Sequence, residues 1–447
     1  MQLPEQAPDV ATLFLDVLAD AERRFAPVFR AGIGPEPEGR YLHWDELRRR
    51  TPPGDLTPVE WWLAVGWRRE AMRSPLPLGD KTNRPFWFAR TSSLDERLHQ
   101  VDRKLGGRVD TQDPGIATPE RRDRYLIGSL MEEAICSSQL EGASTTRQEA
   151  RELLLSGRKP KDRDERMIAN NFQAMELIRA HLREPLSRDF LLELHRTLTE
   201  GTLEPGAVGR FRRPDETITV QSHADGTVLH VPPQAAALEE RLSALFQFAN
   251  EAPGQVFVHP FVRAAALHFM LSYEHPFVDG NGRTARALFY WSMLRQGYWL
   301  TEFLAISRVI KTAPGQYLRA FLHSETSRGD MTYFLLHQLE VVLRATEVLF
   351  AYVEREERQI RDAEHILKGA HRFNHRQRAV LSHALRHPAE LHTIQAHQRE
   401  HGVVYQTARQ DLLDLARAGY FRKMKRGHAF VFAPAARLSG AIKRARA

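Results

Sequence analysis

Cysteine is almost absent from this chain of 447 residues, which contains a single copy, Cys136. A lone thiol excludes an internal disulfide and a zinc site built from cysteines, and its apolar neighbours in the sequence favour simple packing. Long uncharged hydrophobic runs are missing too, and residues 1–5 lack the basic start of a signal peptide. We therefore expect no membrane segment and a cytoplasmic location.

Three motifs of common nucleotide and ester chemistry are also missing. The sequence has no Walker phosphate loop, no His-Glu-x-x-His zinc motif and no Gly-x-Ser-x-Gly nucleophile elbow. Any enzymatic function must therefore depend on another arrangement of residues.

Excess positive charge is confined to the C-terminal end. The chain has a net charge of +7, and residues 401–447 alone hold ten Lys or Arg against two acids, a local charge of +8. The rest is nearly neutral, and with 42% hydrophobic and 27% charged residues the whole chain resembles ordinary globular proteins. At this length we expect two or three domains, and the basic end suggests an acidic partner such as nucleic acid.

Residues 275–286 concentrate the chemistry-bearing side chains of the sequence. The stretch joins an imidazole, a carboxylate, a Gly-Asn-Gly turn and two arginines ahead of a predicted helix. Its key residues are His275, Asp279, Gly280, Asn281, Gly282, Arg283 and Arg286. Glycines allow positive φ angles, so successive N–H groups can form an anion-binding nest that the start of the helix reinforces. The stretch therefore predicts a phosphate-binding site.

The other side chains of this stretch fit the same function. Asp279 is a hard oxygen ligand of the kind that holds Mg²⁺ on substrate phosphates. Arg283 and Arg286 are three residues apart, so they share a helix face and can bind two different phosphates. The near-neutral pKa typical of histidine suits His275 to take a proton from an attacking hydroxyl.

Each fragment alone has an ordinary explanation, since Asp-Gly-Asn-Gly is a common turn and His-Pro commonly marks a helix end. Together, however, residues 275–286 match the signature His-Pro-Phe-x-(Asp/Glu)-Gly-Asn-Gly-Arg-x-x-Arg, and the chain thereby resembles the Fic family. An earlier copy of the opening, at residues 259–262, continues into Arg263 and three alanines without glycines. We expect only a helix start there.

The resemblance implies a protein adenylyltransferase. Such an enzyme moves AMP from ATP to a Ser, Thr or Tyr hydroxyl of a protein target, which can be the enzyme itself, and releases pyrophosphate. By motif position, His275 is the base, Asp279 holds Mg²⁺, and residues 280–282 form the anion nest. Arg283 then steadies the phosphates and Arg286 binds the γ-phosphate.

Two further segments gain a meaning from the resemblance. Ser137-x-x-x-Glu141-Gly142 is by itself an ordinary helix end, but it resembles the inhibitory motif (Ser/Thr)-x-x-x-Glu-(Gly/Asn) of the Fic class with an N-terminal inhibitory helix. Its expected partner is Arg286, for which Glu141 would compete with the γ-phosphate. Tyr317, beyond the signature helix, is a candidate contact for adenine.

Hydrophobic periodicity predicts a mainly α protein. With the resemblance it gives a Trp-rich helical cap at 1–110, an inhibitory helix segment at 111–163, a helical Fic core at 164–342, a linker helix at 343–370 and a winged helix-turn-helix domain at 371–447. The predicted helices up to the end of the core are 119–155 with a break at Gly142, 165–182, 187–200, 234–251, 261–274, 283–296 and 314–325. A β-hairpin of two β-branched runs, 216–221 and 227–231, interrupts the core. In the Fic family such a flap holds the target segment by strand pairing.

The last domain is predicted from helix order and charge. A long charged helix at 334–367 leads to helices at 374–386, 391–401 and 404–418 and to hairpin strands at 420–424 and 428–432. The polar start of the third helix suits base edges, and four cations on the hairpin suit phosphates. DNA binding is one prediction, and an interaction or dimerisation module is the alternative.

Two rival functions stay open beside adenylyl transfer. The chain can be a DNA-binding regulator whose Fic core senses a nucleotide, as the basic end suggests. It can also be a hydrolase in which Glu141 positions water to remove AMP from a modified protein. A homodimer is compatible with either function.

Overall fold

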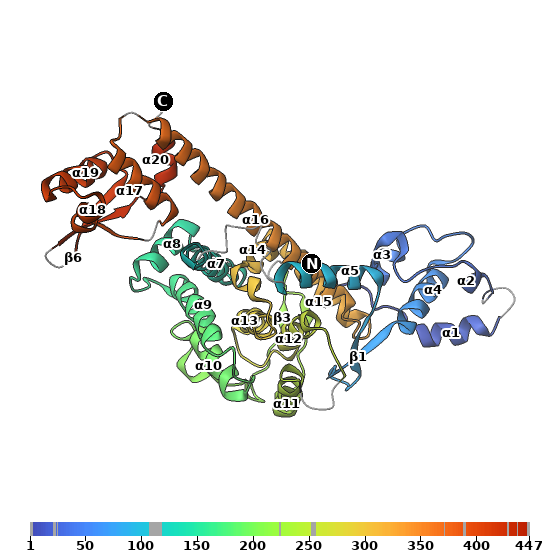
Figure 1. Ribbon diagram of the computed structural model, residues 1–447. Coiled ribbons are helices and arrows are strands. Elements are labelled where there is room, and N and C mark those ends of the chain that lie inside the picture. The colour runs from blue at the N-terminus through green and yellow to red at the C-terminus, as the bar shows by residue number, and fades with distance from the viewer. Residues whose placement is uncertain are drawn as a thin grey trace. The chain divides into compact units, whose positions relative to one another are not determined.

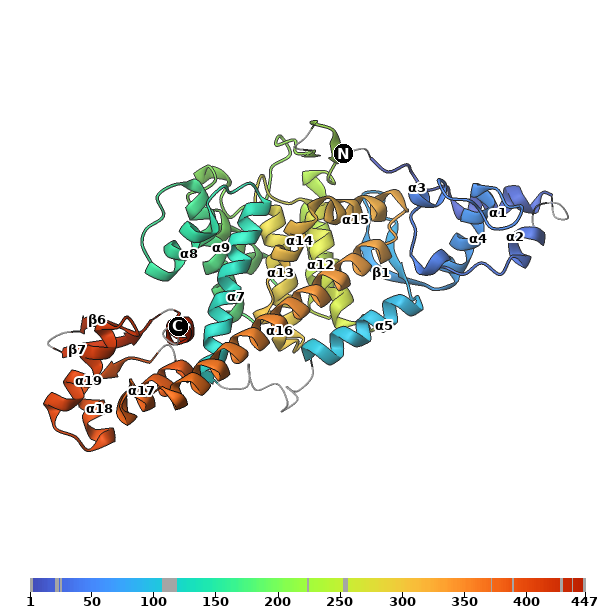
Figure 2. The same ribbon diagram turned by 90° about the horizontal axis from the view of Figure 1, so that it is seen from above.

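The computed structural model describes residues 3–20, 24, 26–106, 119–222, 225–251, 256–370, 372–387, 390–426, 429–435 and 437–444. This described part is mainly helical, as predicted, and includes three small antiparallel sheets (Figures 1 and 2). It divides into two compact units, Met1–Gly107 with Ser129–Thr346, and Arg108–Gly128 with Glu347–Ala447. Within the described ranges, no helix combines the length and the apolar sequence that a membrane span requires.

The first helices of the chain enclose a small core lined by tryptophans. They are α1 (Val10–Leu18), α2 (Ala26–Arg30), α3 (Trp44–Leu47) and α4 (Pro58–Ala71), with a 3-10 turn at Pro37–Gly39. Thr57 and Glu60 form a capping box that starts α4. Trp44, Trp61 and Trp62 are buried together, so these tryptophans serve packing, as expected.

A β-hairpin follows where the sequence pattern predicted only helices and breaks. The strands β1 (Arg73–Gly79) and β2 (Pro85–Ala89) pair antiparallel and lead to α5 (Ser92–Val101) and a π-helical turn. The prediction was wrong here because two prolines of β1 prevent a helix, whereas the alternating side chains Leu76 and Leu78 are buried on one face of the strand.

The helices that surround the signature stretch lie close to their predicted positions. They are α7 (Pro119–Leu140), α8 (Arg147–Ser156), α9 (Arg163–Ala180), α10 (Arg188–Thr199), α11 (Leu238–Ala249), α12 (Pro260–Glu274), α13 (Asn281–Arg295) and α15 (Pro314–Thr326). The short α14 (Ile306–Thr312) and the 3-10 turns at Pro205–Ala207, Ala235–Ala237 and Trp299–Phe303 were not predicted. One or two helical turns show too little periodicity to be recognised.

Two helices, α12 and α13, form the buried centre of the first unit. Nearly all their residues are buried, as in helices enclosed by others on every side. They lie side by side in both views (Figures 1 and 2). The loop that joins them, residues 275–280, therefore has a rigid element at each end.

The predicted flap is present but shorter than expected. Its strands are β3 (Val220–Gln221) and β4 (Val228–His230), which pair antiparallel. The Glu216 carboxylate accepts hydrogen bonds from the N–H of Arg213, at 2.7 Å, and from the Arg210 guanidinium, at 2.6 and 2.8 Å. These bonds fold the expected start of the first strand into a turn.

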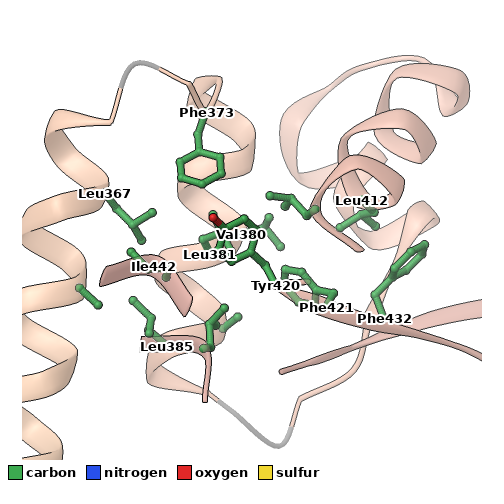
Figure 3. Close-up of a cluster of buried hydrophobic side chains, with 14 of the residues drawn as sticks. Leu367, Phe373, Val380, Leu381, Leu385, Leu412, Tyr420, Phe421, Phe432 and Ile442 are labelled. Atoms are coloured by element: carbon green, nitrogen blue, oxygen red, sulfur yellow. The ribbon is translucent and has the colours of Figure 1, made fainter. Parts of the chain in front are cut away.

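The second unit contains the predicted helices and hairpin of the basic end. The long α16 (Thr332–Gly369) begins in the first unit and continues into the second, where α17 (His375–Arg386), β5 (His392–Thr393), α18 (Ile394–His401), α19 (Tyr405–Arg417), β6 (Phe421–Arg426), β7 (Ala429–Pro434) and α20 (Leu438–Arg444) follow. The sheet order is β5-β7-β6. Figure 3 shows its core, in which Leu381 and Phe432 are fully buried between the helices and the sheet.

Two details of this unit differ from the prediction. The second helix begins at Ile394, three residues late, because His392 and Thr393 form a short strand paired with β7. The terminal helix α20 was not expected. His428, predicted to begin the last strand, lies outside the described residues. The element order is that of the predicted helices and hairpin, and the winged helix-turn-helix assignment itself stays a prediction.

Candidate active site

The loop between α12 and α13 brings the signature residues together in the first unit. His275 ends α12 in the left-handed region, with φ 46° and ψ 55°, and Gly280 takes φ 86° before α13. The positive φ angles at His275 and Gly280 turn the chain between the two helices. The His275 imidazole and the start of α13 are therefore joined by one short loop. A Cβ on Gly280 would lie 2.8 Å from the Thr199 methyl carbon, so only glycine fits there.

His275 is held as a neutral base. Its Nδ1 lies 3.2 Å from the Ser272 carbonyl oxygen, which can only accept, so Nδ1 carries the proton and Nε2 keeps a lone pair. Burial lowers the pKa of His275 to about 4, so the ring is uncharged at neutral pH. Arg212 fixes the backbone beside it: its Nε donates to the His275 carbonyl at 2.9 Å and its N–H to the Pro276 carbonyl at 2.8 Å.

The anion nest is shaped by the side chain of Asn281. Its Oδ1 accepts from the Phe277 N–H at 3.0 Å and its Nδ2 donates to the Phe277 carbonyl at 2.8 Å. Asn281 is buried, and both polar groups of its side chain are bonded to the loop backbone. Its backbone N–H is therefore the group that can bind a ligand. The N–H groups of Asn281, Gly282 and Arg283 have no acceptor within the helix, because they open it.

Asp279 is the exposed carboxylate of the site. Its side chain is 42% exposed and its Oδ2 lies 3.6 Å from an Arg163 nitrogen. His195 positions the backbone: its Nδ1 accepts from the Gly209 N–H at 3.1 Å, so Nε2–H donates to the Asp279 carbonyl at 2.9 Å. The same ring stacks on Phe277 at 3.7 Å. An exposed carboxylate beside an anion nest has the chemistry that suits Mg²⁺ bound to phosphates.

Arg283 is a buried cation with unused donors. Its side chain has no exposed surface, and NH1 donates to the Leu198 carbonyl at 2.8 Å. Nε and NH2 are buried and make no hydrogen bond to any described residue; NH2 lies 3.9 Å from Asp279 Oδ2. Burial lowers the pKa of Arg283. Unpaired buried donors are costly, and a phosphate group would satisfy them.

Arg286 is occupied by the predicted inhibitory motif on α7. Its Nε donates to Ser137 Oγ at 2.9 Å, and its NH2 donates to Glu141 Oε1 at 2.7 Å and to the Ser137 carbonyl at 3.1 Å. Burial lowers the pKa of Arg286, but Glu141, with smaller contributions from Tyr317 and Glu133, more than offsets burial, so the pKa is raised. Gly142 ends α7 with φ 96°, and Ala143 N–H bonds back to the Ser138 carbonyl.

The Glu141 carboxylate also lies over the anion nest. A Cβ built on Gly282 would lie 2.2 Å from Glu141 Oε1 and 3.2 Å from Arg286 NH1. The carboxylate therefore packs directly against the first turn of α13, where a phosphate would bind. Ser137 binds the arginine through its Oγ and its carbonyl oxygen, and no described hydrogen bond joins it to the Glu141 carboxylate.

Tyr317 lies on α15 at the edge of the same site. Its hydroxyl is 2.6 Å from His268 Nε2, and its ring packs edge-on against Phe321 with centroids 5.1 Å apart. Burial raises the pKa of Tyr317 to about 12. The hydroxyl is thus committed to α12, and the adenine contact stays a prediction.

The comparisons with known proteins agree with this geometry. Residues 185–293 match the model of the Fic/DOC family. Over these residues the chain resembles a Fic domain. A crystal structure of a Fic family protein from Desulfovibrio desulfuricans G20 has the same fold, with a TM-score of 0.51, 17% identity and coverage of 78% of this chain and 98% of that chain. The predicted mainly α Fic fold is confirmed, and the predicted resemblance to the Fic family is supported over residues 185–293.

Curated relatives cover less of the chain. A protein adenylyltransferase Fic of Nematostella vectensis is 33% identical over 115 residues, which are 26% of this chain and 24% of that protein. Another, of Culex quinquefasciatus, is 30% identical over 221 residues, 47% of this chain and 41% of that protein. The chain thus spans less than half the length of these relatives.

Four supporting residues of the Fic domain escaped the sequence analysis. Arg212 and His195 hold the signature loop, Thr199 packs against Gly280, and His268 bonds Tyr317. Only Arg212 had a signal in the sequence, because it belongs to Gly209-Arg210-Phe211-Arg212, a stretch that also resembles the Fic core. The other three lie on helices at positions that periodicity assigns to the core, so only the folded chain reveals their contacts.

Proposed function

We propose that this chain is a protein adenylyltransferase that moves AMP from ATP to a Ser, Thr or Tyr hydroxyl and is restrained by Glu141. The observation that carries the proposal is the loop between α12 and α13, where a neutral imidazole, an exposed carboxylate and a buried arginine with two unused donors surround an anion nest. Every part of this set has a use in nucleotidyl transfer.

The attacking hydroxyl would lose its proton to His275. The Nε2 lone pair is available because Nδ1–H is bonded to the Ser272 carbonyl, and the ring is neutral at pH 7. His230 anchors the flap beside this base: one of its nitrogens lies 2.8 Å from the Tyr273 carbonyl and the other 2.7 Å from Glu325. The flap strands are therefore fixed at a place where a protein segment could pair with them.

The phosphates of ATP would bind at the start of α13. The N–H groups of residues 281–283 and the two unused donors of Arg283 supply the positive field, and Asp279 would hold Mg²⁺ against the phosphates. Mg²⁺ there would neutralise charge on the leaving pyrophosphate. Arg286 could bind the γ-phosphate only after Glu141 withdraws from it.

A hydrolytic role for Glu141 stays as the alternative chemistry at this site. Its carboxylate is 26% exposed, so water can reach it, and it lies against the start of α13. Incubating the purified chain with labelled ATP, alone and with cell lysate, tests transfer directly. The proposal requires protein-bound AMP label, and release of AMP from a labelled protein without any transfer would favour the hydrolase.

Asp279→Ala should make the transfer reaction insensitive to Mg²⁺. The variant removes the exposed carboxylate beside the nest, so one charge-assisted contact of about 1.5 kcal/mol is lost, which corresponds to about a tenfold fall in rate. The measurement is AMP incorporation across a Mg²⁺ titration ending in excess EDTA. Asp215→Ala, which removes an exposed carboxylate on the loop before the flap, is the control. A wild-type enzyme that works equally well in EDTA contradicts the metal role.

A second candidate function, DNA binding, rests on the basic hairpin of the second unit. Arg422, Lys423 and Lys425 on β6 are exposed, and Lys423 lies over the Phe430 ring at 3.7 Å. The start of α19 presents the exposed polar side chains of Gln406 and Gln410. This combination suits phosphates and base edges in the way that the sequence analysis predicted.

Replacing both Lys423 and Lys425 with alanine should weaken the binding of the whole protein chain to duplex DNA, whatever the DNA sequence. Each phosphate contact contributes about 0.9 to the slope of log affinity against log salt, so the slope should fall by about 2. Electrophoretic or fluorescence titrations at several salt concentrations measure it. Lys368→Ala, an exposed lysine at the end of α16, should leave the slope unchanged. Absence of duplex binding by the wild type at low salt would instead favour an interaction module.

A further inference from the structure

Three potential metal ligands share one face of α18 in the second unit. His397, Glu400 and His401 are spaced i, i+3 and i+4, so their side chains project from the same side of the helix. One ligand atom from each lies within 4.8 Å of the others. These residues lie outside residues 185–293, which match the Fic/DOC family.

His397 has the surroundings of an oriented metal ligand. The residue is 2% exposed, and its Nε2 lies 3.3 Å from Asp411 Oδ2, so Nε2–H donates to the carboxylate. That bond places the lone pair on Nδ1, which is buried and makes no hydrogen bond to any described residue. A carboxylate that holds one imidazole nitrogen while the other binds the ion is the usual arrangement behind metal-bound histidines.

The carboxylate behind His397 is itself fixed from two further helices. Asp411 lies on α19, and its oxygens accept from Arg376 Nε at 2.7 Å and from Asn374 Nδ2 at 2.7 Å, both at the start of α17. Its orientation therefore does not depend on α18. The His397 ring is held ready by contacts that exist before any ion binds.

His401 offers a second unused nitrogen on the same face. Its Nε2 is buried and makes no hydrogen bond within the described chain, and its ring centroid lies 4.6 Å from that of His397. Two buried imidazole nitrogens without partners are costly for a folded unit. A shared cation would satisfy both, and the exposed Glu400 side chain can turn to bring a carboxylate oxygen to it.

We propose that the second unit binds one Zn²⁺ ion through His397 Nδ1, His401 Nε2 and the Glu400 carboxylate, with water as the fourth ligand. Imidazole nitrogens prefer zinc to Mg²⁺ or Ca²⁺, which take oxygen ligands. Zn–N bonds of about 2.1 Å in a tetrahedral site place ligand atoms roughly 3.4 Å apart, so the side chains must close slightly around the ion. The order of these residues, His-x-x-Glu-His, differs from that of the His-Glu-x-x-His zinc motif, which the sequence lacks.

The bound ion would join the end of α18 to the core of the unit. Through His397 and Asp411 the site connects α18 to α19 and to the start of α17. Zn²⁺ should therefore stabilise this unit against unfolding, since an ion that binds only the folded state shifts the folding equilibrium toward it.

The test uses the whole chain, stripped of metal with EDTA and dialysed. Co²⁺ is titrated in, because a four-coordinate Co²⁺ site has strong visible absorption, and Zn²⁺ is then added to displace it. The wild type should give a visible spectrum that saturates at one equivalent and disappears with Zn²⁺. His401→Ala should lose the spectrum, and Glu400→Gln should weaken Zn²⁺ binding by roughly 10- to 100-fold, the effect typical of losing one supporting interaction at a metal site.

Two controls separate this site from other metal binding. His365→Ala removes an exposed histidine of α16 in the same unit, and Asp279→Ala removes the proposed Mg²⁺ ligand; both should keep the Co²⁺ spectrum. Glu400 is exposed, so Glu400→Gln should fold even if substitution of a histidine disturbs the unit. Equal Zn²⁺ affinity in wild type, Glu400→Gln and His401→Ala, or a Co²⁺ spectrum typical of six-coordinate ions, would overturn the proposal.

Discussion

Replacing His275 with alanine should lower the rate of AMP transfer by roughly 10²- to 10⁴-fold, the usual contribution of a positioned general base. The imidazole is neutral, its Nδ1–H is committed to the Ser272 carbonyl, and its Nε2 faces no competing donor among the described hydrogen bonds. The nest and Arg283 lie on α13 and do not depend on the ring, so ATP binding should change little. Initial rates of label incorporation and the Kd for ATP are the two measurements.

The chain supplies its own matched control for this substitution. Residues 259–262 repeat the opening tetrapeptide of the signature, but there His259 caps α12 by accepting from the Phe261 N–H, and its Nε2 lies 3.1 Å from Asp102. His259→Ala should cost some stability, about 1 kcal/mol for a lost cap, and leave the rate of transfer per folded molecule unchanged. An active His275→Ala enzyme would remove the imidazole from the mechanism.

Glu141→Gly should raise AMP incorporation by about ten- to a hundredfold. The contact between Glu141 and Arg286 is a charge-assisted bond in a nearly buried site, worth about 1.5 to 3 kcal/mol, and it must be broken before Arg286 can bind the γ-phosphate. The carboxylate also covers the first turn of α13 beside Gly282, so its removal opens the nest as well. Converted to a rate, this energy gives the stated range.

The comparison that isolates the charge is Glu141→Gln, which keeps the shape of the side chain. It should activate the enzyme less than Glu141→Gly, because the amide still covers the nest. Ser137→Ala should activate it less again, since Ser137 Oγ holds Arg286 Nε without competing for phosphate. The double variant Glu141→Gly with His275→Ala is the blank. Equal incorporation by wild type and Glu141→Gly would show that Glu141 is no restraint, and lost AMP removal in Glu141→Gly would make it a hydrolytic residue.

The site was predictable from the sequence where the chemistry is local. The nest, the end of α12 and the start of α13 lie within twelve residues, and their conformations follow from glycine and from helix capping. The pairing of Glu141 with Arg286 crosses 145 positions of the chain, and only the resemblance to the Fic family suggested it. Nothing local could indicate that Glu141 also packs against Gly282.

The fold, too, was predictable where a local sequence pattern decides the structure and was not predictable elsewhere. Long periodic helices such as α12 and α16 were predicted within two residues, whereas the β1–β2 hairpin was missed because its prolines indicated only a break. The flap was predicted too long because β-branched residues favour strands, and the ionic contacts of Glu216 overrode that preference. In both segments, strand pairing or ionic contacts that form in the folded chain decided the difference, rather than the propensities of the individual residues.

The left-handed conformation of His275 means that the position is not optimised for folding. A residue with a Cβ at φ 46° costs roughly 1 to 2 kcal/mol relative to glycine, and Arg212 must hold the two carbonyls beside it to keep the turn. Selection for stability alone would replace the histidine with glycine or asparagine. Histidine at this position therefore lowers the stability of the fold and supplies the proposed catalytic base. A related chain with another residue there would keep the fold and lack the base.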